Sequence, residues 1–135
     1  MISGFTNGCF DCLHEGHRHF LRECKKQCDF LWIGINSDSS VKKLKGEGRP
    51  VQKVSYRVDV LVKYLRENFD FSDFDYRIFD TEAHLEMLIR DLKPDILFKG
   101  EDYKHKTITG AQYAKKVELI PLLAGYSTTK VIAGD

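Results

Sequence analysis

The chain has 135 residues, of which 42% are hydrophobic and 30% are charged, and its formal net charge is +1. A chain of this length fits one domain, so we expect a single domain over residues 1–135. The charge balance excludes a strongly basic nucleic-acid-binding protein, and the longest apolar stretches fall far short of the ~20 residues that a membrane-spanning helix needs. We therefore expect a cytoplasmic globular protein with no nucleic-acid or membrane partner.

The N-terminal segment predicts a short strand, a polar turn and a helix. An apolar run near Phe5 indicates the strand. The helix should begin near Gly16, and its buried face is indicated by four residues at helical spacing: Phe20, Leu21, Cys24 and Cys28. At such a turn the free N–H groups of the helix and its positive dipole end favour an anion, and Gly8 lets the backbone approach a ligand. His14 and His17 add donors, which are positively charged if the site raises their pKa. The turn is therefore a predicted phosphate site.

All four cysteines lie in the N-terminal part of the chain, at Cys9, Cys12, Cys24 and Cys28. The first two have the spacing of metal ligands, and the other two would complete a zinc site. Burial of Cys24 and Cys28 as small apolar side chains in a reducing compartment is favoured instead, because this pair fits one helical face. A redox pair at Cys9 and Cys12 is disfavoured, because further residues separate it from the start of the helix.

Strand-like and helix-like segments then alternate. The continuous apolar run over 30–35 is typical of a parallel strand that is covered on both faces. A short helix is predicted over 38–44, capped by Asp38 or Ser39, and a longer amphipathic helix from about Ser55. This order of elements predicts an α/β fold with a parallel sheet and right-handed crossovers.

The C-terminal half continues the alternation. Strands are predicted over 76–79, 95–98 and 117–122, with a helix over about 85–92 between the first two. A terminal helix should follow residues 127–129, whose hydroxyl groups can cap it. The predicted sheet therefore has five strands.

Three more polar clusters lie at predicted strand ends or loops, where parallel sheets bind ligands. They span residues 42–50, 99–103 and 125–129. The first is either a solvated basic turn or, because of its glycines, a mobile lid. The third is a helix cap that would also bind an anion. Neither a G-x-x-x-x-G-K-[ST] loop nor a G-x-G-x-x-G turn is present, so the phosphate must be held differently.

Together these motifs resemble those of the cytidylyltransferase-like nucleotidyltransferases, whose hallmark is H-x-G-H after the first strand. Residues 8–17 are similar to the family's G-x-F-D-x-x-H-x-G-H, and residues 125–129 to its late S-T-T motif. The resemblance implies an α/β fold, a Rossmann-like three-layer sandwich with a central, mainly parallel five-stranded sheet. It also implies Mg²⁺ as cofactor and a homodimer.

Within the family, the segments 36–38, 44–50 and 99–103 most resemble heptose 1-phosphate adenylyltransferases of ADP-heptose synthesis. This implies transfer of AMP from ATP to a sugar 1-phosphate such as D-glycero-D-manno-heptose 1-phosphate, with release of pyrophosphate, in lipopolysaccharide biosynthesis. One alternative is a glycerol 3-phosphate cytidylyltransferase that uses CTP, although the usual R-T-E-G-I-S-T-T ending is replaced here over 123–129. Another alternative is a non-catalytic nucleotide-binding regulator.

The resemblance also assigns site residues. His14, His17 and Lys45 would be catalytic, donating to the phosphates and to the charge of the transition state. The nucleotide would be bound by Asn7, Gly8, Cys9, Phe10, Gly16, Lys99, Gly100, Asp102, Tyr126, Ser127, Thr128 and Thr129. The sugar phosphate would be bound by Asp11, Asp38, Arg49 and Arg57. No residue is assigned as a metal ligand, and Mg²⁺ would neutralise the triphosphate and the leaving pyrophosphate.

Overall fold

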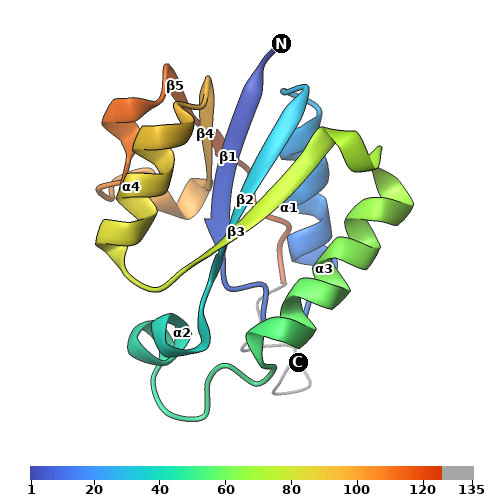
Figure 1. The fold of residues 1–135 in the computed structure, drawn as a ribbon, viewed down its shortest axis with the longest axis vertical. Helices are drawn as coiled ribbons and strands as arrows, with labels where there is room; N and C mark the ends of the chain where they lie inside the picture. Colours follow the sequence, from blue (N-terminus) through green and yellow to red (C-terminus); the bar gives the residue numbers. More distant parts are fainter. Residues whose placement is uncertain (126–135) are drawn as a thin grey trace.

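A parallel five-stranded sheet forms the centre of the computed structural model, which describes residues 1–125 (Figure 1). The strands are β1 (Ser3–Gly8), β2 (Phe30–Asn36), β3 (Phe74–Phe79), β4 (Ile96–Gly100) and β5 (Lys116–Ile120). Their order is β3-β2-β1-β4-β5, and all four pairings are parallel. The predicted sheet is therefore confirmed, and it is wholly rather than mainly parallel.

The strand order reverses at the centre of the sheet. From β1 the chain moves outward through β2 to β3, and then returns to the other side of β1 to form β4 and β5. In open parallel sheets a ligand site lies beyond the carboxyl ends of the strands at such a reversal. The fold therefore places the end of β1, where the histidine motif begins, at the position expected for a ligand.

Helices cover both faces of the sheet, which confirms the three-layer prediction. They are α1 (Glu15–Lys25), α2 (Asp38–Lys45), α3 (Val54–Asn68) and α4 (Glu82–Leu92), with short 3₁₀ turns η1 (Phe71–Asp73), η2 (Glu101–Tyr103) and η3 (Ala111–Tyr113). Figure 1 shows α1 and α3 on one face, α4 on the other, and α2 beyond the ends of the strands. None of the helices in residues 1–125 is long and apolar enough to cross a membrane.

Each face of the sheet has its own apolar core. Leu97 and Phe98 are neighbours in β4, and successive strand residues point to opposite faces. Leu97 accordingly belongs to the core with Leu85 and Ile89 of α4, whereas Phe98 belongs to the core with Leu61 of α3. All five side chains are almost completely buried. Burial on both faces explains the continuous apolar runs in β2 and at the start of β4.

Three features of the structure differ in detail from the sequence predictions. Ser37, not Asp38 or Ser39, caps α2: its side chain accepts a hydrogen bond from Ser40 N, because the Asp38 carboxylate is bonded to Val54 N. Cys28 is buried as expected but lies beyond the end of α1. The last strand ends at Ile120 rather than at residue 122. The predicted terminal helix lies outside the described residues.

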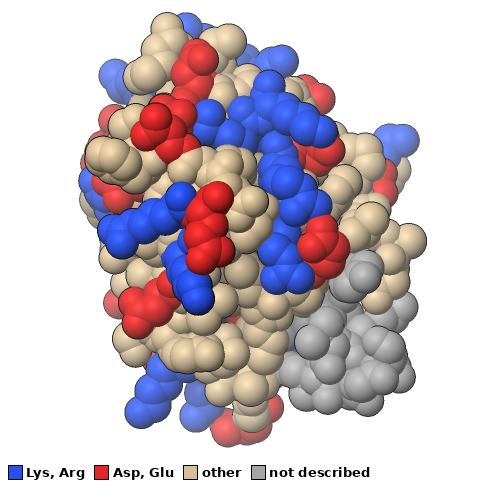
Figure 2. Space-filling view, turned by 90° about the vertical axis from the view of Figure 1, so that its right-hand side faces the viewer, with Lys and Arg blue, Asp and Glu red and all other residues tan. Residues whose placement is uncertain are grey.

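Charged side chains of both signs are interspersed over the outer surface beside α3, as Figure 2 shows. On α1, for example, Glu15 forms ion pairs with Arg18 and Arg22. Such exposed pairs contribute little to stability. The face in view thus carries mixed charge, in keeping with the net charge of +1.

Candidate functional site

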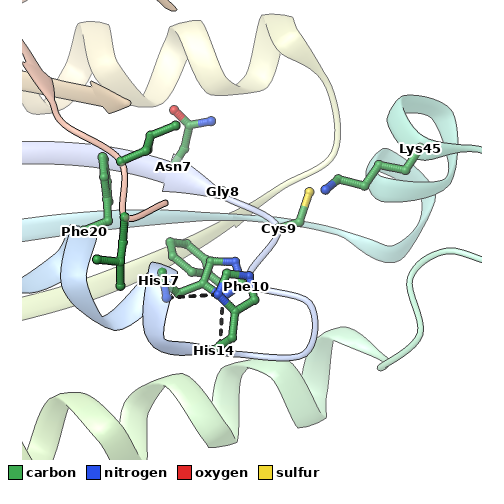
Figure 3. A pocket seen from close by; sticks show the side chains of 11 residues that line it. Asn7, Gly8, Cys9, Phe10, His14, His17, Phe20 and Lys45 are labelled. Carbon is green, nitrogen blue, oxygen red and sulfur yellow. Dashed lines mark hydrogen bonds between the residues drawn. The ribbon is translucent and has the colours of Figure 1, made fainter. Parts of the chain in front are cut away.

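Two adjoining cavities lie beyond the carboxyl ends of the strands. The first, here called the histidine cavity, has a volume of about 290 Å³ and is lined in part by Phe10, His14, His17, Phe20, Leu122 and Leu123 (Figure 3). The second, here called the Glu82 cavity, has a volume of about 430 Å³ and is lined in part by Asn36, Glu82, Lys99, Tyr103, Thr107 and Thr109. Both are also lined by Asn7, Gly8, Cys9 and Lys45. The two cavities therefore meet at the end of β1.

The two histidines of the motif are also the N-terminal cap of α1. His14 Nδ1 accepts a hydrogen bond from Gly16 N at 3.1 Å, and His17 Nδ1 accepts one from His14 N at 3.1 Å. The rings stack with their centroids 3.8 Å apart (Figure 3). A nitrogen that accepts carries no proton, so each neutral ring has its proton on Nε2. The cap thus makes both rings Nε2–H donors.

Both imidazoles are neutral in this environment. Burial lowers the pKa of His17 to about 3, and proximity to the His14 imidazole and to the Lys45 amine lowers it further. Burial also lowers the pKa of His14. Adding a proton to either Nδ1 would in addition break the bond that it accepts from the backbone. Positively charged imidazoles would require a raised pKa, whereas the pKa of both rings is lowered. The rings therefore act as neutral donors.

The turn between β1 and α1 has a strained backbone. Phe10 has φ = 51° and Cys12 has φ = 54°, in the left-handed region that residues other than glycine seldom adopt. Such residues cost about 1–3 kcal/mol each and persist where the surroundings hold them. The turn therefore needs outside support.

Asp11 provides part of that support. Its carboxylate is completely buried and accepts hydrogen bonds from Val51 N (2.8 Å), Gln52 N (2.9 Å) and Arg49 Nε (3.1 Å). Burial alone would raise the pKa of Asp11, but these three bonds outweigh it and the pKa is lowered. An ionised carboxylate with its oxygens engaged in this way holds the segment after α2 against the turn. Arg49 keeps one buried nitrogen, Nη2, without a hydrogen-bond partner among residues 1–125.

Arg57 provides the rest of the support. It is 1% exposed, and Nη1 donates to Cys9 O (2.7 Å) and Asn36 O (2.8 Å) at the ends of two neighbouring strands. Nε donates to Gln52 O (2.9 Å) and Nη2 to Asp38 Oδ1 (2.8 Å). Direct contact between Arg57 and a sugar phosphate would require these bonds to open, whereas 43% of the Asp38 side chain is exposed. The bonds support a positioning role for Arg57, and phosphate contact by either residue stays a prediction.

Lys45 is the last residue of α2 rather than part of a loop. It lines both cavities, and in Figure 3 its side chain extends toward Cys9. Gly46 and Gly48, which follow, have φ of 90° and 81°. The Lys45 side chain is exposed, in contrast to the buried His14 and the half-buried His17.

Of the predicted cluster at the end of β4, Lys99 and Tyr103 line the Glu82 cavity, whereas Gly100 and Asp102 are not among the residues of 1–125 that line either cavity. Lys99 is 7% exposed, and its Nζ donates to Asn7 Oδ1 at 2.7 Å and lies 4.8 Å above the Tyr103 ring in the Glu82 cavity. Burial lowers the pKa of Lys99 to about 8. Gly100 faces the other way: a Cβ there would lie 2.6 Å from Asp102 Oδ1 and 2.8 Å from Leu122, a residue of the histidine cavity.

Several lining residues were missed in the sequence: Asn36, Glu82, Thr107, Thr109, Leu122 and Leu123. Most follow the end of a strand at the same edge of the sheet, so the strand-end rule, applied to every strand, would have found them. The predicted Tyr126, Ser127, Thr128 and Thr129 lie outside the described residues.

Metal ligands are scarce in the site. Residues 1–125 contain no group of three or more His, Cys, Asp or Glu side chains suited to a metal ion. The donor set fits Mg²⁺ only as an ion held mainly by the phosphates of a nucleotide and by water, as is usual for this ion. Burial raises the pKa of Cys9, Cys12, Cys24 and Cys28, which disfavours the thiolates that zinc or redox chemistry needs.

Comparison with known proteins gives matches over almost the whole chain. A family model described as cytidylyltransferase-like matches residues 5–133. Bifunctional protein HldE of Campylobacter jejuni subsp. doylei is 52% identical over 128 residues, which are 95% of this chain and 26% of that protein. Bifunctional protein HldE of Hyphomonas neptunium is 44% identical over 134 residues, which are 96% of this chain and 26% of that protein. The chain thus spans about a quarter of the length of these relatives.

Solved structures match the fold. A bifunctional NMN adenylyltransferase/ADP ribose pyrophosphatase from Francisella tularensis has a TM-score of 0.69 and 14% identity, over 96% of this chain and 40% of that one. The lipopolysaccharide core biosynthesis protein from Thermoplasma volcanium GSS1 has a TM-score of 0.63 and 24% identity, over 91% of this chain and 97% of that one. These likenesses show a common fold.

Proposed function

This chain belongs to the cytidylyltransferase-like family, and on that basis we propose that it is a nucleotidyltransferase that transfers AMP from ATP to a sugar 1-phosphate. The proposed acceptor is D-glycero-D-manno-heptose 1-phosphate. The segments 44–50 and 99–103, which resemble heptose 1-phosphate adenylyltransferases, support this choice of substrates.

The stacked histidine pair is the observation that carries the proposal. Two neutral Nε2–H donors and the N-terminus of α1 come together beside a cavity that the amine of Lys45 also lines. Oriented N–H donors with a nearby cation are suited to the charge of a reacting phosphate. Because their cap bonds fix both rings in advance, the donors need no reorganisation during the reaction.

In the proposed reaction an oxygen of the sugar phosphate attacks the α-phosphorus of ATP. The new P–O bond forms while the bond from that phosphorus to the β-phosphate oxygen breaks, and pyrophosphate leaves. A phosphate monoester has its second pKa near ~6, so the nucleophile is already largely a dianion and requires no general base. The protein's task is then to position two polyanions and to offset their repulsion.

Individual residues divide this task. His14 and His17 donate to phosphate oxygens, and Lys45 adds a positive charge that approaches from α2. Asp11 and Arg57 hold the strained turn in place, so that the donors keep their geometry. Mg²⁺, when bound with the triphosphate, supplies charge neutralisation. Phosphate binding by Arg49, a homodimeric state and a cytoplasmic location remain predictions of the same proposal.

Pyrophosphate release tests the proposal. The purified chain is assayed with Mg²⁺ and each pairing of ATP or CTP with heptose 1-phosphate or glycerol 3-phosphate. Release with ATP and heptose 1-phosphate alone is the expected result. Release with CTP and glycerol 3-phosphate would move the enzyme to the cytidylyl branch. Nucleotide binding without release in any pairing would indicate a regulator and contradict the proposal.

A further inference from the structure

The Glu82 cavity differs in chemistry from the histidine cavity that it adjoins. A carboxylate, two threonine hydroxyls and two asparagine amides are among its polar groups, whereas no carboxylate of residues 1–125 lines the histidine cavity. An ionised carboxylate accepts hydrogen bonds and donates none, whereas hydroxyl and amide groups both donate and accept. The cavity is also lined by Lys45 and Lys99, so its groups suit a ligand that carries hydroxyl groups together with a negative charge.

Glu82 is held in place on one side and open on the other. It is the first residue of α4, and its Oε2 accepts a hydrogen bond from Thr109 Oγ1 at 2.7 Å. The side chain is exposed at the cavity, so its oxygens have lone pairs available for a further donor. A fixed carboxylate that borders a cavity is well placed to accept bonds from neighbouring hydroxyl groups of a ligand.

The charges that line the two cavities determine how a charged ligand is oriented. A phosphate would be repelled by the Glu82 carboxylate, and it would be attracted by Lys45 and by the donors of the histidine turn, which lie at or beyond the junction of the cavities. The buried amine of Lys99 lies between these ends and is bonded to Asn7, which lines both cavities. A sugar phosphate therefore fits with its phosphate at the junction and its carbon chain toward α4.

We propose that Glu82 is a specificity-determining residue, which accepts hydrogen bonds from the hydroxyl groups of the acceptor and so selects a polyhydroxylated phosphate ester. The inference rests on the proposed function, because it takes the second substrate to be a sugar phosphate. It assigns to Glu82 a role in binding and none in the bond-making step.

The variant Glu82→Gln tests this role while preserving the size of the side chain and its bond from Thr109. Binding is measured by isothermal titration of heptose 1-phosphate, and of glycerol 3-phosphate, into protein saturated with a non-hydrolysable ATP analogue. Hydrogen bonds to charged groups are the stronger ones, so we expect the Kd of the sugar phosphate to rise roughly tenfold, about 1.4 kcal/mol. The KM of the sugar phosphate should rise with its Kd, whereas the Kd of the ATP analogue should stay unchanged.

Glu86→Gln is the matched control. Glu86 lies one turn further along α4 and is bonded to Gln112 Nε2 at 3.1 Å, outside both cavities. Its substitution should leave the Kd of the sugar phosphate unchanged. Methyl phosphate, which has the phosphate but no hydroxyl group, is the control ligand, and its affinity should not fall in Glu82→Gln.

The outcomes separate the two proposals. A wild-type protein that neither binds nor converts heptose 1-phosphate would overturn the proposed function and this inference together. A wild-type protein that converts heptose 1-phosphate, with an unchanged Kd for this ligand in Glu82→Gln, would overturn the inference alone. Weaker binding of methyl phosphate or of the ATP analogue in Glu82→Gln would also overturn it, because Glu82 would then act on phosphate rather than on hydroxyl groups.

Discussion

The histidine turn and the end of α2 both contribute to the candidate site, but they are built in opposite ways. In the turn, His14 and His17 are fixed by backbone bonds, and the buried side chains of Asp11 and Arg57 tie it to the start of α3. Lys45, in contrast, is an exposed side chain that is followed by glycines. In the proposed reaction, this difference means that the donors to the phosphate are fixed before the substrate arrives, whereas the exposed charge of Lys45 adjusts to it.

Removing a donor of the turn should have the largest effect. His17→Ala should lower kcat by roughly 10² to 10³, the usual cost of losing one oriented donor to a developing negative charge. Steady-state pyrophosphate release measures it, and circular dichroism checks that the fold is kept. His19→Ala, in the same helix but outside both cavities, is the control and should keep normal kinetics. A normal kcat in His17→Ala would contradict the assignment of His17 as a donor to the reacting phosphate.

Removing the support of the turn should affect stability as well as activity. Arg57→Ala leaves Cys9 O and Asn36 O without their buried donor, and the free energy of unfolding should fall by about 3 kcal/mol, as for other broken buried pairs. Urea unfolding measures the change. Arg66→Ala, an exposed residue of the same helix, should cost far less. Equal losses in the two variants would mean that the turn does not depend on Arg57.

Acid should weaken the turn in a defined pH window. Burial lowers the pKa of His17 to about 3 from an ordinary value of 6.5, so between these values the unfolded chain binds the proton more readily than the folded one. Stability therefore falls as the pH drops through that window, by about 2 kcal/mol at pH 5 relative to pH 8. Urea unfolding across this range measures it. The slope should be much smaller in His17→Ala, and an equal slope would contradict the neutral state of the ring.

Removing the exposed charge of Lys45 should have the smallest effect on kcat. Lys45→Met removes the charge but keeps an unbranched side chain, and we expect kcat to fall roughly tenfold, since an exposed and flexible charge is partly screened by water. The loss should shrink as salt is added, whereas that of His17→Ala should not. Lys43→Met, which lines neither cavity, is the control. A larger loss in Lys45→Met than in His17→Ala would reverse the comparison.

The sequence predicted the elements well because their patterns are local. The apolar run over 30–35 identified a strand buried on both faces, and the histidine motif located the site at a strand end. Ser37 was missed as the cap of α2 because its neighbours are equally good caps, and a distant bond from Val54 to Asp38 decides between them. Tertiary contacts of this kind leave no local pattern.

The chemical state of the site also depends on contacts that periodicity does not encode. An arginine in an amphipathic helix is usually exposed, so nothing in the sequence indicated that Arg57 bridges two strand ends. Likewise the neutral state of His17 follows from its burial and its cap bond, neither of which the motif reveals. Glu82 resembled an ordinary acidic residue in the first turn of a helix.

The two histidines both cap α1 and form part of the proposed phosphate site, so the first turn of the helix and this site should open together. If the first turn frays, the amides of His14 and Gly16 lose their acceptors, and both rings are released at the same moment. Local opening of this kind is visible as hydrogen exchange at those two amides. A bound phosphate that engages the rings should slow both exchange rates together, so that occupancy of the site can be followed at the backbone without any label on the ligand.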